Sequence, residues 1–218
     1  MLKSYVIRSG RFTTAQRNAY DKLPSGIVIP FSDEKQDFSA IFGNSADIIM
    51  EIGFGSGFAT AEIAQANPEI NYLGIEVHRP GIGRLLWEIE KRSLNNIRII
   101  EHDAALVAEK MILAGLLKGI HIFFPDPWPK TRHRKRRLIQ RPFTKLLAAC
   151  LKKGGYLYMV TDWDDYANHA LEELTSTQEF CNAYEGFADP QTWRPHTKFE
   201  KKGLAKEHKI RELFFIKR

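Results

Sequence analysis

Apolar residues along this chain gather in short runs, which alternate with longer stretches where an apolar residue recurs every three or four positions. Short apolar runs are typical of buried strands, and the longer spacing is typical of helices with one buried face. The pattern predicts strands at residues 47–52, 71–76, 97–101, 120–124, 156–161 and 211–217. It predicts helices at residues 58–66, 81–93, 104–113, 138–151 and 163–174, with Gly154 and Gly155 ending the fourth helix and Asp162 capping the fifth.

Strands that alternate with helices of about ten residues indicate a doubly wound α/β sheet. Residues 1–45 lack this alternation, so we expect an N-terminal extension that packs on a domain of residues 46–218 or folds over its ligand. In doubly wound sheets, ligands bind at the carboxyl ends of the strands. A carboxylate stands at or just after five successive strands, and these residues are Glu51, Glu76, Asp103, Asp126 and Asp162. This placement predicts a binding site along that edge.

Three glycines, Gly53, Gly55 and Gly57, separate the first strand from the first helix. The spacing is close to the dinucleotide fingerprint GxGxxG, which seats a pyrophosphate on a helix N-terminus. However, Phe58 stands in the place of the third glycine, and Glu51 would repel a diphosphate. A carboxylate there suits a cationic ligand, and S-adenosylmethionine carries a sulfonium and an ammonium group. Its carboxylate can accept hydrogen bonds from the N–H groups of the turn.

Two more acids fit the same ligand. Glu76 ends the second strand, where a carboxylate can accept hydrogen bonds from both hydroxyls of a ribose. Asp103 follows the third strand and is placed to receive the adenine amino group. Either residue could instead cap a helix or lie in a solvated loop, but their register with Glu51 favours the cofactor.

A second region of candidate chemistry follows the fourth strand, where Asp126 lies between Pro125 and Pro127 and is followed by Trp128. Of the twelve residues from 130 to 141, seven are Lys or Arg and none is acidic, so this run supplies the whole excess of a chain whose formal net charge is +6. A local basic run predicts phosphate contacts. The candidate RNA-contacting residues are Arg132, His133, Arg134, Lys135, Arg136 and Arg137.

Each of these features also has a purely structural interpretation. Asp126 could be only a turn residue, and Trp128 could pack in the core as readily as it could stack on a base. The basic run could be a solvated face, although its position beside the predicted site favours phosphate binding.

Taken together, several motifs resemble the TrmB family of tRNA (guanine-N7-)-methyltransferases. They are the glycine turn with Glu51, residues 75–78 (IEVH), 123–130 (FFPDPWPK) with the basic run, 161–167 (TDWDDYA), 197–200 (TKFE) and 9–16 (SGRFTTAQ). The resemblance spans nearly the whole chain, and PDPWPK is its most specific part. Thr131 departs from it by interrupting a basic run that is often continuous.

The resemblance implies the Rossmann-like class I fold of S-adenosylmethionine-dependent methyltransferases, with a mostly parallel, seven-stranded sheet. It implies methyl transfer to N7 of a guanosine at position 46 of the tRNA variable loop, with Asp126 as the catalytic residue. The cofactor contacts would be Glu51, Gly53, Gly55, Gly57, Glu76, Asp103 and Asp126. The substrate contacts would be Lys130, Asp162, Thr197, Lys198, Phe199 and Glu200.

Guanine N7 carries a lone pair and no proton, so its attack on a sulfonium methyl group needs alignment and not a general base. Proteins usually recognise guanine by donating to N7 and O6, but a donor on N7 would block the nucleophile. We therefore expect the base to be unstacked from the tRNA and held by its Watson–Crick edge. Asp126, Asp162 and Glu200 are candidate acceptors for that edge.

Composition narrows the remaining possibilities. The only cysteines, Cys150 and Cys181, stand outside any CxxC or Cys/His cluster, and the seven histidines show no metal-ligand spacing. No apolar run approaches the ~20 residues of a membrane span. We expect a cytoplasmic, metal-free protein that binds tRNA and no membrane, as a monomer or a homodimer.

Three other functions compete with this interpretation. A methyltransferase for an exocyclic amine often carries Asp/Asn-Pro-Pro-aromatic after its fourth strand, whereas this chain has Pro-Asp-Pro-Trp. Glu51 and Phe58 disfavour a nicotinamide-dependent oxidoreductase. An RNA-binding module without catalytic activity would bind tRNA but not S-adenosylmethionine.

Overall fold

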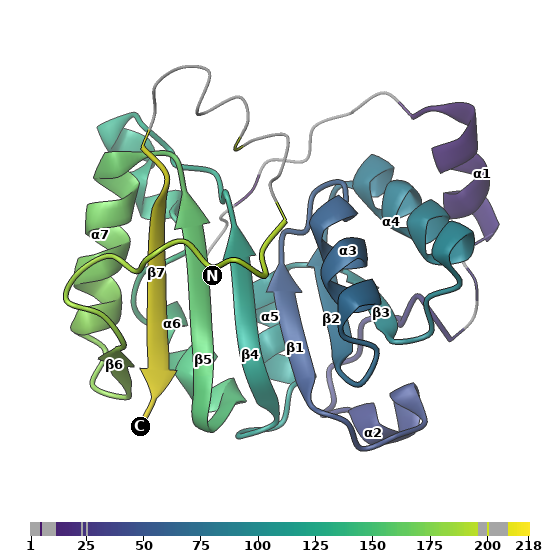
Figure 1. Cartoon of the computed structure of the whole chain (residues 1–218), viewed down its shortest axis with the longest axis horizontal. Helices are drawn as coiled ribbons and strands as arrows, with labels where there is room; N and C mark the ends of the chain where they lie inside the picture. Colours follow the sequence, from purple (N-terminus) through teal and green to yellow (C-terminus); the bar gives the residue numbers. More distant parts are fainter. Residues whose placement is uncertain (1–4, 6–11, 23, 25, 196–199, 201–208) are drawn as a thin grey trace. The chain divides into compact units, whose positions relative to one another are not determined.

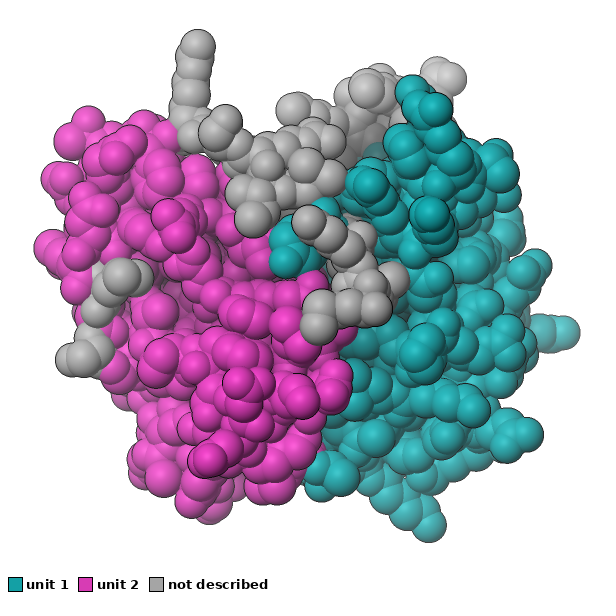
Figure 2. Space-filling model, turned by 180° about the vertical axis from the view of Figure 1, so that it is seen from behind, with its two compact units in different colours: residues 1–6, 114–192, 196–218 teal, residues 7–113, 193–195 magenta. Residues whose placement is uncertain are grey.

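The computed structural model describes residues 5, 12–22, 24, 26–195, 200 and 209–218 (Figure 1). The chain forms two compact units (Figure 2). Unit 2 consists of residues 7–113 and 193–195, and unit 1 consists of residues 1–6, 114–192 and 196–218. In the described part of the chain, no helix is both long and apolar enough to cross a membrane.

Unit 2 contains a parallel sheet in the order β3-β2-β1. The strands are β1 (Ile48–Ile52), β2 (Asn71–Glu76) and β3 (Ile97–Glu101). The helices are α1 (Thr14–Lys22), α2 (Phe38–Phe42), α3 (Phe58–Ala66), α4 (Arg79–Arg92) and α5 (Ala104–Lys110). Every residue of β1 and β2 is buried, as expected for parallel strands covered on both faces. Figure 1 shows α3 and α5 on opposite faces of these strands.

Two glycines of α4 allow close contacts within unit 2, one with the glycine turn and one with α1. A Cβ atom added at Gly81 of α4 would lie 1.9 Å from the carbonyl oxygen of Gly55. At Gly83, it would lie 2.4 Å from the carbonyl oxygen of Gln16 in α1. The N-terminal helix α1 therefore rests on α4, and α4 rests directly on the glycine turn.

Unit 1 contains four strands in the order β4-β5-β7-β6. They are β4 (Leu117–Phe123), β5 (Leu151–Thr161), β6 (Phe180–Asn182) and β7 (Arg211–Lys217). β4 and β5 run parallel, whereas β7 runs antiparallel to both β5 and β6. The helices are η1 (Thr131–Arg136, a 3₁₀ helix), α6 (Phe143–Cys150) and α7 (Asp164–Thr175).

The elements predicted from the sequence are present, but several of their bounds differ. β4 and β5 begin at Leu117 and Leu151, and not at residues 120 and 156. The helix predicted at 138–151 is only α6, because residues 138–142 precede it without helical structure. Gly154 and Gly155 do not end that helix but lie inside β5. Gly155 stands where the β4–β5 register shifts, and a Cβ atom there would lie 3.0 Å from the Lys118 carbonyl oxygen. In addition, α5 ends at Lys110 and not at residue 113.

Candidate cofactor and substrate sites

In unit 2, the turn after β1 has the backbone conformation that its glycines permit. Gly53, Gly55 and Gly57 have φ angles of +73°, +58° and +66°, in the left-handed region that disfavours residues with a Cβ atom. Gly57 is the N-cap of α3 and provides no side-chain cap for the first N–H groups of that helix. Such N–H groups suit a carboxylate, so the turn fits the acidic end of S-adenosylmethionine.

Glu76, at the end of β2, holds this turn in place. Its Oε2 accepts a hydrogen bond from the Gly55 N–H at 2.8 Å, while Oε1 accepts from Val77 and His78 at 2.7 and 3.0 Å. An ionised carboxylate offers about four acceptor positions. Glu76 therefore keeps little capacity, on Oε2, for a ribose hydroxyl, and its predicted contact with the cofactor stays a prediction.

Glu51 is a buried acid, with 3% of its surface exposed. Burial raises its pKa to about 7, the charge of Glu76 adds to the rise, and a 2.8 Å hydrogen bond donated by Thr60 opposes it. A nearby cation would favour the ionised form and lower this pKa. The environment of Glu51 therefore fits the positively charged groups of S-adenosylmethionine.

Asp103 caps a helix, which is the interpretation that the sequence analysis disfavoured. Its Oδ1 accepts hydrogen bonds from the N–H groups of Ala105 and Leu106 at 2.9 and 3.1 Å, at the start of α5. Both capping bonds engage one oxygen, so the capping role leaves Oδ2 for a ligand. The predicted contact with adenine stays a prediction.

A network that the sequence analysis missed lies two residues before Asp103. Glu101 accepts hydrogen bonds from the Tyr20 hydroxyl at 2.6 Å and from Arg79 Nε at 2.8 Å. Burial and this bond to a carboxylate raise the pKa of Tyr20 to about 12. The network ties α1 to β3 and α4, and no sequence signal links residues 81 positions apart.

In unit 1, the segment after β4 combines exposure with an unusual backbone. Asp126 is exposed, and its predicted contact with a substrate stays a prediction. Phe124 and Trp128, on either side of it, have φ angles of +50° and +45°. Residues other than glycine rarely adopt this conformation, which costs on the order of 1–3 kcal/mol, and such positions cluster at functional sites. Trp128 is half-buried, with the guanidinium of Arg136 5.0 Å from the centre of its ring.

Residues 131–136 of the basic run form η1, and the run contains both exposed and buried basic residues. Lys130, Arg132, Arg134, Lys135 and Arg136 are exposed. His133 is half-buried, and burial together with neighbouring cations lowers its pKa. Arg137 is only 1% exposed and pairs with Asp165, so the prediction that it contacts RNA is wrong for this conformation.

Asp162 follows β5 but does not cap α7. The N-cap residue is Trp163, whose N–H donates to Thr161 Oγ1 at 3.3 Å. Asp126 and Asp162 thus follow the carboxyl ends of two adjacent parallel strands. Glu200 is buried, and the other predicted substrate contacts, Thr197, Lys198 and Phe199, lie outside the described residues.

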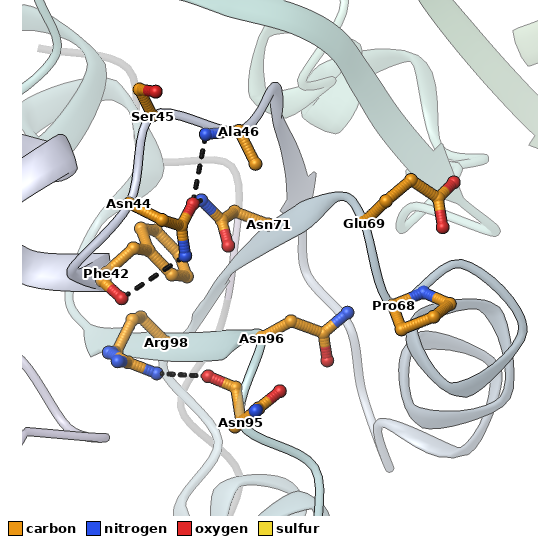
Figure 3. A pocket seen from close by; sticks show the side chains of 10 residues that line it. All are labelled: Phe42, Asn44, Ser45, Ala46, Pro68, Glu69, Asn71, Asn95, Asn96 and Arg98. Atoms are coloured by element: carbon orange, nitrogen blue, oxygen red, sulfur yellow. Dashed lines mark hydrogen bonds between the residues drawn. The ribbon is translucent and has the colours of Figure 1, made fainter.

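A pocket of about 450 Å³ lies at the opposite ends of the unit 2 strands (Figure 3). Asn71 and Asn96 stand at or before the first residues of β2 and β3. The polar groups here bond to one another and to the backbone: Asn44 Oδ1 accepts from Asn71 and from the Ala46 N–H, and Asn96 Nδ2 donates to three carbonyl groups. These hydrogen bonds join the loops that precede the strands.

Comparison with known proteins adds a family to this geometry. A family model described as "Putative methyltransferase" matches residues 45–213. The chain is 51% identical to the tRNA (guanine-N(7)-)-methyltransferase of Nitrosomonas europaea, over 99% of this chain and 96% of that protein. It is 48% identical to the protein of the same name from Paraburkholderia xenovorans, over 100% of this chain and 84% of that protein.

Solved structures of low sequence identity share the fold. The 16S rRNA methyltransferase KamB matches with a TM-score of 0.58 and 14% identity, over 100% of both chains. The 16S rRNA (adenine(1408)-N(1))-methyltransferase from Catenulisporales acidiphilia, solved with cosubstrate SAM, matches with a TM-score of 0.57 and 16% identity, over 85% of this chain and 92% of that chain. The predicted fold class, a doubly wound and mostly parallel α/β methyltransferase fold, is confirmed.

Proposed function

This chain belongs to the tRNA (guanine-N(7)-)-methyltransferase family, and we propose that it methylates N7 of guanosine 46 in the tRNA variable loop. It is a methyltransferase whose cosubstrate is S-adenosylmethionine and whose acceptor is tRNA. The observation that carries this conclusion is about 50% identity, over the whole chain, to relatives with that activity in their names. The position within tRNA and the roles of individual residues are our proposal.

We assign the cosubstrate to the glycine turn and the acids beside it in unit 2. Glu51 offers a carboxylate to the cationic groups, and the turn of Gly53, Gly55 and Gly57 offers N–H groups to the carboxylate. The remaining capacity of Glu76 suits a ribose hydroxyl, and Asp103 Oδ2 suits the adenine amino group. The sulfonium centre supplies an activated methyl group, so these residues need only bind and orient it.

Asp126 is the proposed catalytic residue in unit 1. Guanine N7 has no proton to lose, so Asp126 acts as a hydrogen-bond acceptor and a negative charge, and not as a base. Positive charge spreads into the guanine ring as N7 gains the methyl group, and a nearby carboxylate stabilises that charge. Asp162 and Glu200 are the other proposed acceptors for guanine N1–H and N2–H₂. Lys130, with residues 197–199, completes the proposed contacts to the acceptor nucleotide.

The basic residues of η1, of which His133 is half-buried and the others are exposed, would bind the phosphates around the acceptor nucleotide. The proposed set is Arg132, His133, Arg134, Lys135 and Arg136, without the buried Arg137. We also propose a methyltransferase domain at residues 46–218, close to the matched residues 45–213. A tRNA substrate supports a cytoplasmic location, and we propose a metal-free monomer or homodimer.

Methyl transfer from labelled S-adenosylmethionine to unmodified tRNA, followed by nucleoside analysis, tests the proposal. We expect 7-methylguanosine, confined to the variable loop and absent when guanosine 46 is replaced by adenosine. A methylated exocyclic amine would instead assign the chain to the rival class of methyltransferase. Failure of wild-type protein to methylate tRNA, despite binding S-adenosylmethionine, would overturn the proposed acceptor.

A further inference from the structure

Arg137 differs in its surroundings from the other Lys and Arg residues of the basic run, which are exposed. It is 1% exposed and stands first among the fully buried side chains of the described residues by size, whereas Arg134 and Arg136 are exposed. Burying a guanidinium group is costly unless its charge and its N–H groups find partners. The partners of Arg137 therefore show what the fold gains from placing it there.

Those partners come from two segments of unit 1. Arg137 Nε donates to the carbonyl oxygen of Pro127 at 3.0 Å. Its Nη2 forms an ion pair with Asp165, in the first turn of α7, and its Nη1 lies 3.5 Å from the Asp165 carbonyl oxygen. The guanidinium also lies 5.0 Å from the centre of the Tyr166 ring. One buried side chain thus joins residues 124–130, the Asp126 segment, to the start of α7.

The Asp126 segment needs such a partner because of its prolines. Pro125, Pro127 and Pro129 lack the N–H group by which most backbone segments are held. A carbonyl group is the hydrogen-bonding group that each of them keeps, and arginine, which only donates, is suited to bind one. The Pro127 carbonyl belongs to the peptide that enters Trp128, whose φ angle is +45°. The bond from Arg137 therefore restrains the peptide where the backbone is strained.

Asp165 holds Arg137 in turn. Its Oδ1 pairs with Arg134 at 3.0 Å, while its Oδ2 pairs with Arg137. The hydrogen bond from Arg137 lowers the pKa of Asp165, so this carboxylate stays ionised at neutral pH. The Tyr166 hydroxyl accepts a bond from the Ile139 N–H at 3.1 Å, which fixes the ring beneath the guanidinium.

We propose that Arg137 is a positioning residue, which holds the Pro127 carbonyl and through it keeps Asp126 in the orientation required for methyl transfer. The inference rests on the proposed function of Asp126. It differs from the RNA contact predicted from the sequence, because Arg137 acts from inside the unit and touches neither substrate.

The test compares Arg137→Met and Arg137→Lys with Arg141→Met. Arg141 lies in the same basic run as Arg137, is exposed, and pairs with Glu173. Asp165 is 45% exposed, so removing Arg137 strands no buried carboxylate and the variants should fold. Lysine keeps the charge but lacks the fork that reaches Pro127 and Asp165 together. We expect both Arg137 variants to lose at least tenfold in kcat, with KM for tRNA and its salt dependence unchanged, and Arg141→Met to match wild type.

Hydrogen exchange of residues 124–134, measured without substrates, separates this inference from the proposed function. We expect faster exchange in both Arg137 variants and wild-type exchange in Arg141→Met. Wild-type kcat in Arg137→Met, or a loss that appears only as a higher KM for tRNA, would overturn the positioning role. If wild-type protein methylates no tRNA while the exchange result holds, the proposed function fails and the restraint on the segment stands.

Discussion

At the scale of single residues, the sequence revealed where carboxylates stand but not how they are used. Strand ends could be predicted from apolar runs, and so could the placement of Glu51 and Asp103 at them. That Glu51 is buried, with Thr60 as its partner, depends on how α3 packs against β1, which no local pattern encodes. Asp103 caps α5 through one carboxylate oxygen, and this role is compatible with ligand binding through the other. The position of Asp103 after a strand does not distinguish between the two roles.

The raised pKa of Glu51 predicts how cosubstrate binding depends on pH. A cationic ligand favours the ionised carboxylate, which is the minor form below a pKa of about 7. We expect the affinity for S-adenosylmethionine to rise by up to about tenfold per pH unit as pH approaches 7 from below. Titration calorimetry between about pH 5.5 and pH 7 would measure this. Glu51→Gln should bind more weakly at pH 7 and lose the dependence, and an unchanged slope in that variant would exclude Glu51.

The raised pKa of Glu51 also predicts that the folded protein loses stability as pH rises. The folded-state pKa of about 7 lies above the ordinary value of 4.5, so the folded protein holds a proton that the unfolded chain releases. Stability is therefore lost as pH rises from 4.5 to 7, by about 3 kcal/mol in all. Glu51→Gln, which keeps an acceptor for Thr60, should be more stable than wild type at pH 8 and equal to it below pH 4.5. Denaturant unfolding at both pH values would show this, and equal stability at pH 8 would contradict it.

Asp126 carries the remaining prediction at this scale. We expect Asp126→Asn to lower single-turnover methylation by about a hundredfold or more, because it removes the charge that we propose stabilises the transition state. Binding of tRNA and of S-adenosylmethionine should be nearly unchanged. Asp164→Asn provides a matched control, since Asp164 is an exposed acid of the same unit that pairs with Arg211 at 2.8 Å. Equal rates in the two variants would remove Asp126 from the mechanism.

At the scale of elements, the sequence predicted what local patterns determine and missed what packing determines. The helix at 58–66 and the strands at 71–76 and 97–101 have the predicted bounds, because apolar periodicity and turn glycines mark them. Gly154 and Gly155 lie in β5 and do not end a helix. The sequence could not distinguish these two cases, since two glycines mark a helix end as readily as a strand irregularity. The docking of α1 on α4 follows from Gly83 and Gln16, whose meeting depends on the tertiary fold.

The two close-packed glycines of α4 predict different consequences. Alanine favours a helix over glycine by about 1 kcal/mol, yet both substitutions should destabilise because each Cβ atom would overlap a carbonyl oxygen. Gly81→Ala should displace the turn that we propose binds the cosubstrate, whereas Gly83→Ala should displace only α1. We expect both variants to unfold at lower denaturant concentration, and only Gly81→Ala to bind S-adenosylmethionine more weakly at temperatures where both are folded. If the two variants bound S-adenosylmethionine with equal affinity, the contact of α4 with the glycine turn would not influence cosubstrate binding.

At the scale of the whole molecule, the residues proposed to bind the cosubstrate and those proposed to bind tRNA lie in different units. The cosubstrate residues Glu51, Glu76 and Asp103 belong to unit 2, and Asp126, Asp162 and the basic run belong to unit 1. The sequence could predict this order because both sets follow successive strands. It could not predict which basic residues face solvent. Arg136 and Arg137 are neighbours in one run, and only Arg137 is buried, with Pro127 and Asp165 as its partners.

This division predicts that substitutions can weaken the affinity for tRNA without changing the affinity for S-adenosylmethionine. Arg132 and Lys135 are exposed, and each phosphate they neutralise contributes about 0.7–0.9 to the slope of log affinity against log salt. Replacing both by Gln should flatten that slope by about 1.5 and leave the affinity for S-adenosylmethionine unchanged. The control is the pair Lys152→Gln and Lys153→Gln, which removes the same charge near the start of β5. If the two double variants flatten the slope equally, tRNA responds only to net charge and η1 is an ordinary solvated surface.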